Sequence, residues 1–165
     1  MRLWLRALLF ALLAPGTVAG RVPYLHGRRG GPRIEAAAMP VVGAALVVAG
    51  VVGLAWCFAL FVRVGRGTPA PYDPPVHLVT AGPYRWSRNP MYVAVLLVTF
   101  GVAGLTGSVL VAGYAALLTA VFHLWVRLYE EPRLRRQFGR EYDGYQAAVP
   151  RWLGIPPHPR REERS

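Results

Sequence analysis

The stretch AAAMPVVGAALVVAGVVGLAWCFALFV, residues 36–62, decides the fold because it contains no charged side chain. An α-helix rises about 1.5 Å per residue, so a helix of this length exceeds a hydrocarbon core of about 30 Å. A soluble helix of the same length needs a polar face, and this stretch has none. We therefore expect residues 36–62 to form a membrane-spanning helix, with Cys57 as a small buried apolar side chain.

A second uncharged stretch, residues 90–126, is too long for one comfortable span. The sequence GLTGS at residues 104–108 interrupts it with two glycines, so we expect an antiparallel hairpin of helices over 90–103 and 109–129. The glycines at positions 101, 104 and 107 recur at intervals of three. They would let the two backbones of the hairpin approach closely, or they serve only the turn.

The N-terminal segment has two interpretations. A basic start, a short apolar stretch and small residues near Ala19 are typical of a cleaved signal peptide. A first membrane helix over residues 3–25, kinked near Pro15, fits the same residues, and we favour it. Residues 63–89 are a loop by composition, because prolines and glycines are frequent there.

Composition favours a single membrane domain over residues 1–165. The chain is 54% hydrophobic and only 16% charged, and its net charge of +11 comes from arginine, without any lysine. Soluble domains average about 25% charged residues. A basic chain can bind nucleic acid, but these arginines flank apolar stretches. The expected partner is therefore the lipid bilayer with its anionic head groups, and not nucleic acid.

The C-terminal part has a different pattern. Leu134, Phe138, Tyr142 and Tyr145 recur every three or four residues among charged positions, which predicts an amphipathic helix in the membrane interface. Residues 156–165 are polar and are predicted to be a disordered tail. The predicted fold is all-α. It is a polytopic membrane protein with about four transmembrane helices, the last two a hairpin, followed by this interfacial helix.

Arginine distribution predicts the topology only in part. The arginine-rich flanks 63–88 and 127–151 lie on the same side of the hairpin, and the positive-inside rule places them in the cytoplasm. Two earlier helices would then put the arginines at positions 21, 28, 29 and 33 outside, against that rule. The all-arginine usage with abundant Ala, Gly, Pro and Val indicates a GC-rich bacterial genome. We therefore expect a bacterial cytoplasmic membrane protein with its active site at the cytoplasmic face.

Two polar clusters, residues 77–92 and 127–132, flank the hairpin, which brings them to one side of the membrane. Glu130 and Glu131 end the last span, where a carboxylate opposes the helix dipole by about 0.3–1 kcal/mol. The two carboxylates also repel each other. We therefore expect compensation by a bound ligand or by nearby arginines, of which the candidates are Arg85, Arg88 and Arg127.

Each cluster also has a purely structural interpretation. Pro132 suits the first turn of a following helix, and acids before it would cap that helix. In the first cluster, Asn89 and Pro90 suit the N-cap and first position of a helix. The remaining residues would be interfacial side chains, with arginines reaching toward lipid head groups and aromatics forming a belt: Tyr84, Arg85, Trp86, Arg88 and Tyr92.

The order of the two clusters carries a family resemblance. GPYRWSRNPMY at residues 82–92, a hydrophobic hairpin, and EEPRLRRQFGREYDGYQAAVPRW at residues 130–152 together resemble the isoprenylcysteine carboxyl methyltransferase and phospholipid methyltransferase family. The resemblance extends over a core at residues 76–152, about half the chain. It implies a membrane-bound methyltransferase with S-adenosylmethionine as the methyl donor.

The resemblance also implies which residues contact the donor. Asn89 stands where the family's Arg-His-Pro-x-Tyr box has histidine, and Val76 stands where another histidine is expected, with His77 one place later. An amide can still form hydrogen bonds at position 89. The implied donor-binding residues are Val76, His77, Leu78, Val79, Tyr84, Asn89, Pro90, Met91, Tyr92, Glu130 and Glu131.

Methyl transfer from a sulfonium is an in-line displacement that depends on positioning rather than on an acid–base pair. Consistent with this, the four histidines are widely separated, and the sequence predicts neither a catalytic triad nor a metal site. We assign the catalytic role to Arg88 and Tyr92. In this hypothesis the glutamate pair holds the ribose hydroxyls, Arg88 engages the methionine carboxylate, and Tyr84 or Tyr92 faces the sulfonium.

The remaining polar residues leave alternatives open. Arg127 either neutralises an acidic group of the substrate or is a charge partner of the glutamates. His123, inside the last span, is either a hydrogen-bonding group between packed helices or a residue of a substrate channel.

The predicted function is methylation of a lipophilic substrate by an integral membrane enzyme. Carboxyl methylation of an isoprenylated cysteine is the reaction for which the resembling family is named. Phospholipid-amine and thiol methylation are alternatives. A different class of function is a catalytically silent membrane scaffold or sensor with the same fold, and Asn89 is its best support.

Overall fold

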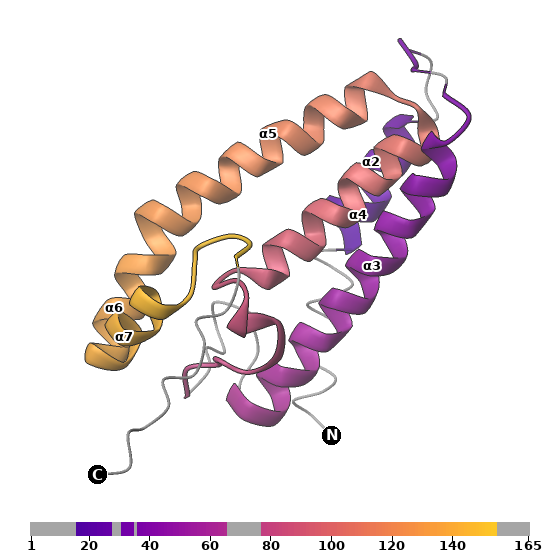
Figure 1. Cartoon of the computed structure of the whole chain (residues 1–165). Coiled ribbons are helices and arrows are strands. Elements are labelled where there is room, and N and C mark those ends of the chain that lie inside the picture. The colour runs from indigo at the N-terminus through magenta and orange to yellow at the C-terminus, as the bar shows by residue number, and fades with distance from the viewer. Residues whose placement is uncertain (1–15, 28–30, 35, 66–76, 155–165) are drawn as a thin grey trace.

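The computed structural model of the chain describes residues 16–27, 31–34, 36–65 and 77–154 (Figure 1). These ranges contain no β-strand, only one isolated bridge between Arg33 and Ser108, which confirms the predicted all-α fold. The α-helices are α2 (Val22–Gly27), α3 (Met39–Leu60), α4 (Pro90–Thr106), α5 (Val109–Trp125), α6 (Glu131–Phe138) and α7 (Arg140–Ala148). Shorter helical segments are η1 (Gly16–Arg21), η2 (Phe61–Gly65), η3 (Gly82–Arg85) and η4 (Val126–Glu130).

The two uncharged stretches form the long helices, as predicted. In the described part of the chain, two helices are long and apolar enough to cross a membrane, Met39–Val64 and Val109–Phe138. The first contains α3 and the second contains α5 and α6, while α4 is a shorter apolar helix beside them. The predicted helix at 3–25 is described only from residue 16, where the chain is helical to residue 27.

The hairpin between α4 and α5 is confirmed, with its turn slightly later than predicted. Its second arm does not end near residue 129 but continues through η4 and α6 to Phe138, so the prediction that Glu130 and Glu131 end the helix is wrong. The helix α4 continues to Thr106, three residues beyond the expected end, and Gly107 forms the turn with φ of 62°. Glycine adopts this left-handed conformation without steric cost. The Ser108 hydroxyl then accepts a hydrogen bond from the Val111 amide at 3.4 Å and caps α5. Serine is a favoured N-cap, so sequence and turn agree.

Glycines produce a close helix contact, but with a different partner from the one predicted. A Cβ atom built on Gly101 would lie 2.7 Å from the Gly43 carbonyl oxygen and 2.8 Å from the Val47 nitrogen, both on α3. A Cβ on Gly104 would lie 3.1 Å from the Gly43 Cα. The expectation that these glycines draw α4 and α5 together is therefore wrong. Gly101 and Gly104 lie on the face of α4 that points toward α3. Because they have no side chains there, the backbones of α3 and α4 come into contact.

Gly101→Ala tests this contact. The added methyl collides with α3 backbone that cannot rotate away, so we expect destabilisation of about 1–3 kcal/mol. The matched control is Gly113→Ala on α5, where an added Cβ meets no atom of the described residues within 4 Å. That change should stabilise the helix by up to about 1 kcal/mol. Thermal denaturation in detergent measures both, and equal effects of the two variants would refute the close α3–α4 contact.

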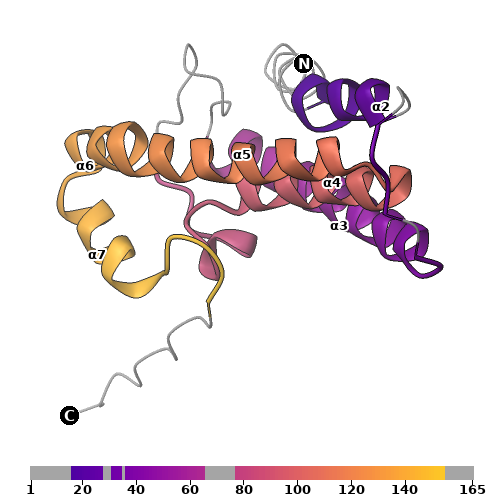
Figure 2. The same ribbon diagram turned by 90° about the horizontal axis from the view of Figure 1, so that it is seen from above.

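The N-terminal helical segment packs against the hairpin (Figure 2). Ala19 is buried in a cluster with Val95, Val98 and Leu118, and the Tyr114 hydroxyl donates to the Val18 carbonyl oxygen at 3.1 Å. At the turn end of the hairpin, the Ile34 amide donates to the Gly107 carbonyl oxygen and the Val109 amide to that of Pro32. The chain that precedes α3 therefore contacts the hairpin at two places, around residues 18–19 and at residues 32–34.

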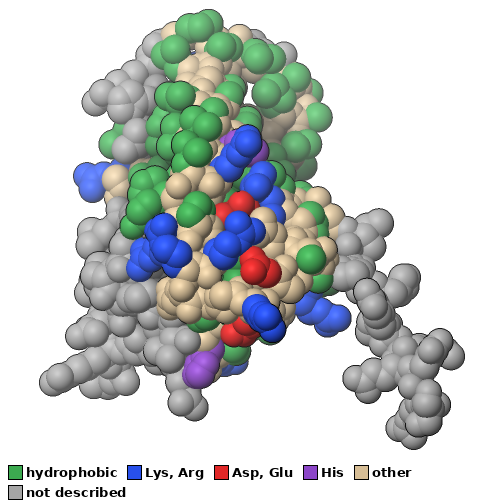
Figure 3. All heavy atoms as spheres, turned by 90° about the vertical axis from the view of Figure 1, so that its left-hand side faces the viewer, with side chains coloured by type: hydrophobic (Ala, Val, Ile, Leu, Met, Phe, Trp, Pro, Cys, Tyr) green, Lys and Arg blue, Asp and Glu red, His purple; other side chains and the backbone are tan. Residues whose placement is uncertain are grey.

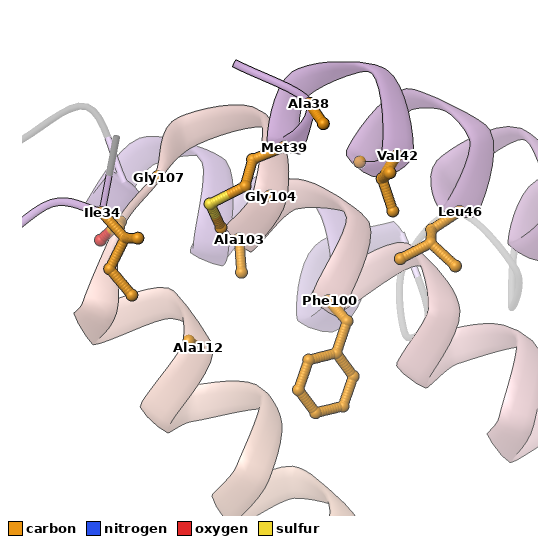
Figure 4. Close-up of a pocket in the computed structure, with 12 residues that line it drawn as sticks. Ile34, Ala38, Met39, Val42, Leu46, Phe100, Ala103, Gly104, Gly107 and Ala112 are labelled. Atoms are coloured by element: carbon orange, nitrogen blue, oxygen red, sulfur yellow. The ribbon is translucent and has the colours of Figure 1, made fainter. Parts of the chain in front are cut away.

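An apolar cavity of about 340 Å³ lies at this turn end (Figure 4). Met39 and Val42 of α3 and Phe100 of α4 line it, with Ala112 of α5. Seventeen residues of α4 separate this end from the polar clusters. The cavity therefore belongs to the helix packing at the opposite end of the hairpin from the candidate site.

The C-terminal amphipathic region forms two helices instead of the one that was predicted. Helix α6 ends at Phe138 and α7 begins at Arg140, because Gly139 adopts φ of 53° and breaks the helix. On the exposed side, Arg135 pairs with Asp143 at 2.8 Å and contacts the Gln146 side chain at 2.6 Å. The break turns Tyr142, only 2% exposed, toward the end of the hairpin.

Candidate active site

The two polar clusters meet at the end of the hairpin where α6 and α7 lie, as predicted. On this side of the molecule, arginine and acidic side chains gather below a surface of hydrophobic side chains (Figure 3). The first cluster precedes α4 and the second follows α5, so an antiparallel hairpin necessarily brings them together. Residues 149–154, which follow α7, return to the same place.

Glu131 lies at the centre of a buried ion-pair network. Arg88 donates from Nη1 to Glu131 Oε1 at 2.9 Å, and the two side chains are 7% and 12% exposed. Arg151 binds the same carboxylate through both oxygens, with Nε at 2.7 Å from Oε1 and Nη2 at 3.0 Å from Oε2. Bidentate guanidinium–carboxylate pairs are strong and directional. Arg88 Nη1 also donates to the Tyr142 hydroxyl oxygen at 3.2 Å.

Arg151, Tyr142 and Tyr84 each have a pKa raised above the ordinary value. The hydrogen bond to Glu131 raises the pKa of Arg151 above its ordinary value. Burial raises the pKa of the Tyr142 phenol, and it raises the pKa of the Tyr84 phenol further. At neutral pH Arg151 is therefore a permanent cation, and the two phenols keep their protons as hydrogen-bond donors.

Glu130 makes a separate contact with the start of α4. The Tyr92 hydroxyl donates to Glu130 Oε2 at 2.7 Å, and the Tyr92 ring packs on Phe122 at a centroid distance of 4.6 Å. Neither glutamate acts as a helix cap, since the N-cap position of α6 has no side-chain hydrogen bond. An ionised carboxylate offers about four lone-pair sites, so Glu130 retains acceptor capacity beyond the Tyr92 bond.

One donor of the network is left over. Arg88 Nε is buried and has no hydrogen-bond partner among the described residues. Buried donors in proteins are nearly always paired, with protein, water or a ligand. An unpaired guanidinium N–H beside a carboxylate network suits the carboxylate of a bound small molecule. The residues present therefore fit an amino-acid-containing donor such as S-adenosylmethionine.

The other predicted donor-binding residues differ in their placement. Tyr84 and Val79 are buried against Cys57 of α3. The Tyr84 carbonyl oxygen accepts a hydrogen bond from the Tyr145 hydroxyl at 2.7 Å. Pro90 is buried and Leu78 and Met91 are half-buried, whereas His77 is exposed and Val76 lies outside the described residues. The structure thus brings together Arg88, Tyr92, Glu130 and Glu131, with Tyr84 and Val79 set deeper against α3.

Asn89 occupies the N-cap position of α4, but its side chain does not cap the helix. Its Nδ2 instead donates to the Arg151 carbonyl oxygen at 3.0 Å, and its backbone amide donates to the Ser87 hydroxyl at 3.0 Å. The structural interpretation of Asn89 was therefore right about position and wrong about the hydrogen bond.

The cations that compensate Glu131 are only partly those predicted. Arg88 is one of them, but Arg127 and Arg85 are exposed and form no ion pair within the described part of the chain. The sequence reasoning missed Arg151. Its position in the last part of the resembling motif, beside Trp152, was the available signal. Trp152 donates from Nε1 to His123 Nδ1 at 3.2 Å, so His123 is a packing group that ties α5 to this segment.

Comparison with known proteins identifies the family. The phospholipid methyltransferase family model matches residues 38–141, which include α3, the hairpin and both clusters. The nickel-cobalt-cadmium resistance protein NccN of Alcaligenes xylosoxydans xylosoxydans is 33% identical over 114 residues, 69% of this chain and 49% of NccN. The chain thus spans about half the length of this curated relative. No solved structure matches.

The family assignment agrees with the helices. In the described part of the chain, both helices that are long and apolar enough to cross a membrane lie within the matched region. The ion pair between Arg88 and Glu131 joins the loop before α4 to the helix that contains α5 and α6. The match covers well over half of the chain, and with the apolar helices it indicates a membrane protein with methyltransferase ancestry. The chain therefore belongs to the phospholipid methyltransferase family.

Proposed function

We propose that this protein transfers a methyl group from S-adenosylmethionine to a lipophilic substrate at the cytoplasmic face of the membrane. The observation that carries the proposal is the half-buried network of Arg88, Glu131 and Arg151 beside the Glu130–Tyr92 pair. This network lies at the end of an apolar hairpin, where a membrane crossed by these helices would meet the water. An active site there can admit a lipid-borne substrate from the side and a water-soluble donor from the cytoplasm.

The side chains suit the chemical groups of the donor. Arg88 Nε, a buried donor without a partner among the described residues, would bind the carboxylate of the methionine part. Glu130 would accept hydrogen bonds from the ribose hydroxyls with its remaining lone pairs. Tyr92 is half-buried and next to Glu130, whereas Tyr84 is 6% exposed and packed on Phe61. Tyr92 is therefore the better candidate to face a sulfonium.

The reaction asks little acid–base chemistry of the protein. S-adenosylmethionine supplies a methyl group activated by the adjacent positive sulfur. The protein has to hold the acceptor in line with the methyl group, and such positioning can lower a barrier by about 7–11 kcal/mol. An acceptor that is already ionised at neutral pH, such as a carboxylate, needs no general base.

The acceptor we favour is a carboxylate on a lipophilic molecule, as in an isoprenylated cysteine. Arg127 supports this choice because it is exposed near the two glutamates and has no ion pair among the described residues. It would neutralise the acidic group of such a substrate. Phospholipid amines and thiols are the alternative acceptors. A catalytically silent scaffold is the alternative from another class of function, and Asn89, whose amide donates to the Arg151 carbonyl oxygen, is its best support.

Calorimetric titration of S-adenosylmethionine into the purified protein in detergent tests the proposal. We expect saturable binding with a dissociation constant below the millimolar range. Absence of binding at millimolar donor would favour a catalytically silent membrane scaffold. A soluble cation that lacks the amino-acid carboxylate, such as trimethylsulfonium, is the matched control and should not compete.

A further inference from the structure

The C-terminal segment, residues 149–154, lies along the loop at residues 86–89. The Arg88 amide donates to the Pro150 carbonyl oxygen at 3.0 Å, and the Gly154 amide donates to that of Trp86 at 3.1 Å. These two backbone hydrogen bonds fix the direction and register of the segment. They do not by themselves fix the orientation of the peptide at Arg151, which lies between them.

Two side chains of the loop fix that peptide. The Arg151 carbonyl oxygen accepts from Asn89 Nδ2 at 3.0 Å and from the Ser87 hydroxyl at 3.3 Å. Asn89 is 7% exposed and Ser87 is 1% exposed, so water does not compete freely for this oxygen. With its carbonyl held on one side, Arg151 directs its guanidinium to the Glu131 carboxylate on the other.

We infer that Asn89 is a positioning residue that acts through Arg151 and does not itself contact the methyl donor. The Asn89 side-chain amide holds the Arg151 backbone. Arg151 in turn orients the Glu131 carboxylate, to which Arg88 also donates. The inference rests on the proposed function in one respect, since it takes Glu131 to belong to the donor site. It assigns a different role to position 89 from the direct donor contact that the family resemblance implies.

Three observations favour this indirect role. The Asn89 amide nitrogen already has a protein acceptor at good distance. Its side chain has no buried nitrogen or oxygen left unpaired among the described residues, in contrast to Arg88 Nε. The carbonyl it binds belongs to the residue that makes the bidentate contact to Glu131. Removal of the Asn89 amide should therefore act on donor binding only as far as it misplaces Arg151.

A double-mutant cycle on donor affinity tests the inference. Asn89→Ala should weaken donor binding about five-fold, and Arg151→Gln about ten-fold or more. Residues that act as one unit do not add, so the double variant should bind no more weakly than Arg151→Gln alone. Arg151→Lys keeps the charge and should recover part of the affinity. Losses that multiply in the double variant would mean that Asn89 contacts the donor directly and would overturn the inference.

Hydrogen exchange separates this inference from the proposed function. Asn89→Ala should accelerate amide exchange in residues 149–154 while leaving α3 and α4 unchanged, which also shows that the variant is folded. This result does not require donor binding, so a wild-type protein that binds no donor would refute the proposed function alone. Unchanged exchange in residues 149–154 would contradict the inference. Gln146→Ala, which removes an exposed amide bound to Arg135, is the matched control and should leave donor affinity unchanged.

Discussion

Glu131→Gln is expected to lower the free energy of unfolding by about 3–5 kcal/mol, because it removes the negative charge from a buried ion pair. The variant leaves the Arg88 guanidinium, on a side chain 7% exposed, without its counter-charge. Arg151 loses its bidentate partner in the same change. Equilibrium unfolding in mixed detergent micelles, monitored by a probe of helix content, measures the loss of unfolding free energy.

The matched control for this variant is Asp143→Asn. Asp143 pairs with Arg135 at 2.8 Å, a distance similar to that of the Glu131 pairs, but both side chains are more than half exposed. Exposed pairs of this kind contribute about 0.2–1 kcal/mol. The two variants remove the same charge from the same short helical region and differ in burial. Equal small losses for both would show that the Glu131 network is solvent-screened, contrary to the structure.

Glu130→Gln is expected to weaken binding of S-adenosylmethionine by about 10- to 100-fold, which corresponds to the loss of a charge-assisted hydrogen bond. Glutamine keeps an oxygen that can accept from the Tyr92 hydroxyl, so the contact between α4 and η4 should persist. The loss should therefore appear in donor affinity and not in stability. Calorimetric titration of the donor, with a melting curve for each variant, separates the two.

Glu141→Gln is the matched control for donor binding. Glu141 lies on α7 and is exposed, so its change to glutamine alters the net charge of the chain by the same amount. Its affinity for the donor should equal that of the wild type. Unchanged affinity in Glu130→Gln would remove the assignment of Glu130 to the ribose, whereas equal losses in both variants would indicate a long-range charge effect.

The features that the sequence predicts well are those set by local composition. An uncharged stretch forms a helix in lipid because every backbone polar group must be paired within it, and α3 and α5 follow this rule. The meeting of the two polar clusters was predictable as well, since an antiparallel hairpin brings its two ends together. Both predictions needed only the order of residues along the chain.

The features that the sequence predicts poorly depend on tertiary contacts. Spacing revealed a bare glycine face on α4, but only the packed structure shows that Gly43 of α3 covers it. The apolar period of the C-terminal region continues through Gly139, although the backbone breaks there with φ of 53°. Arg151 is one of many arginines, and its place beside Trp152 in the resembling motif does not reveal its partner. Only the fold shows that it contacts Glu131.

The most direct test of the proposed function is transfer of label from methyl-labelled S-adenosylmethionine in membranes that contain the protein. Wild-type protein should label a lipophilic product, and release of volatile methanol by mild base would identify that product as a methyl ester. Membranes with the same amount of the Glu130→Gln variant should carry at least about ten-fold less label, because donor binding is weakened. If the wild type gives no more label than Glu130→Gln in either the organic extract or the protein fraction, the proposed methyltransferase activity is contradicted.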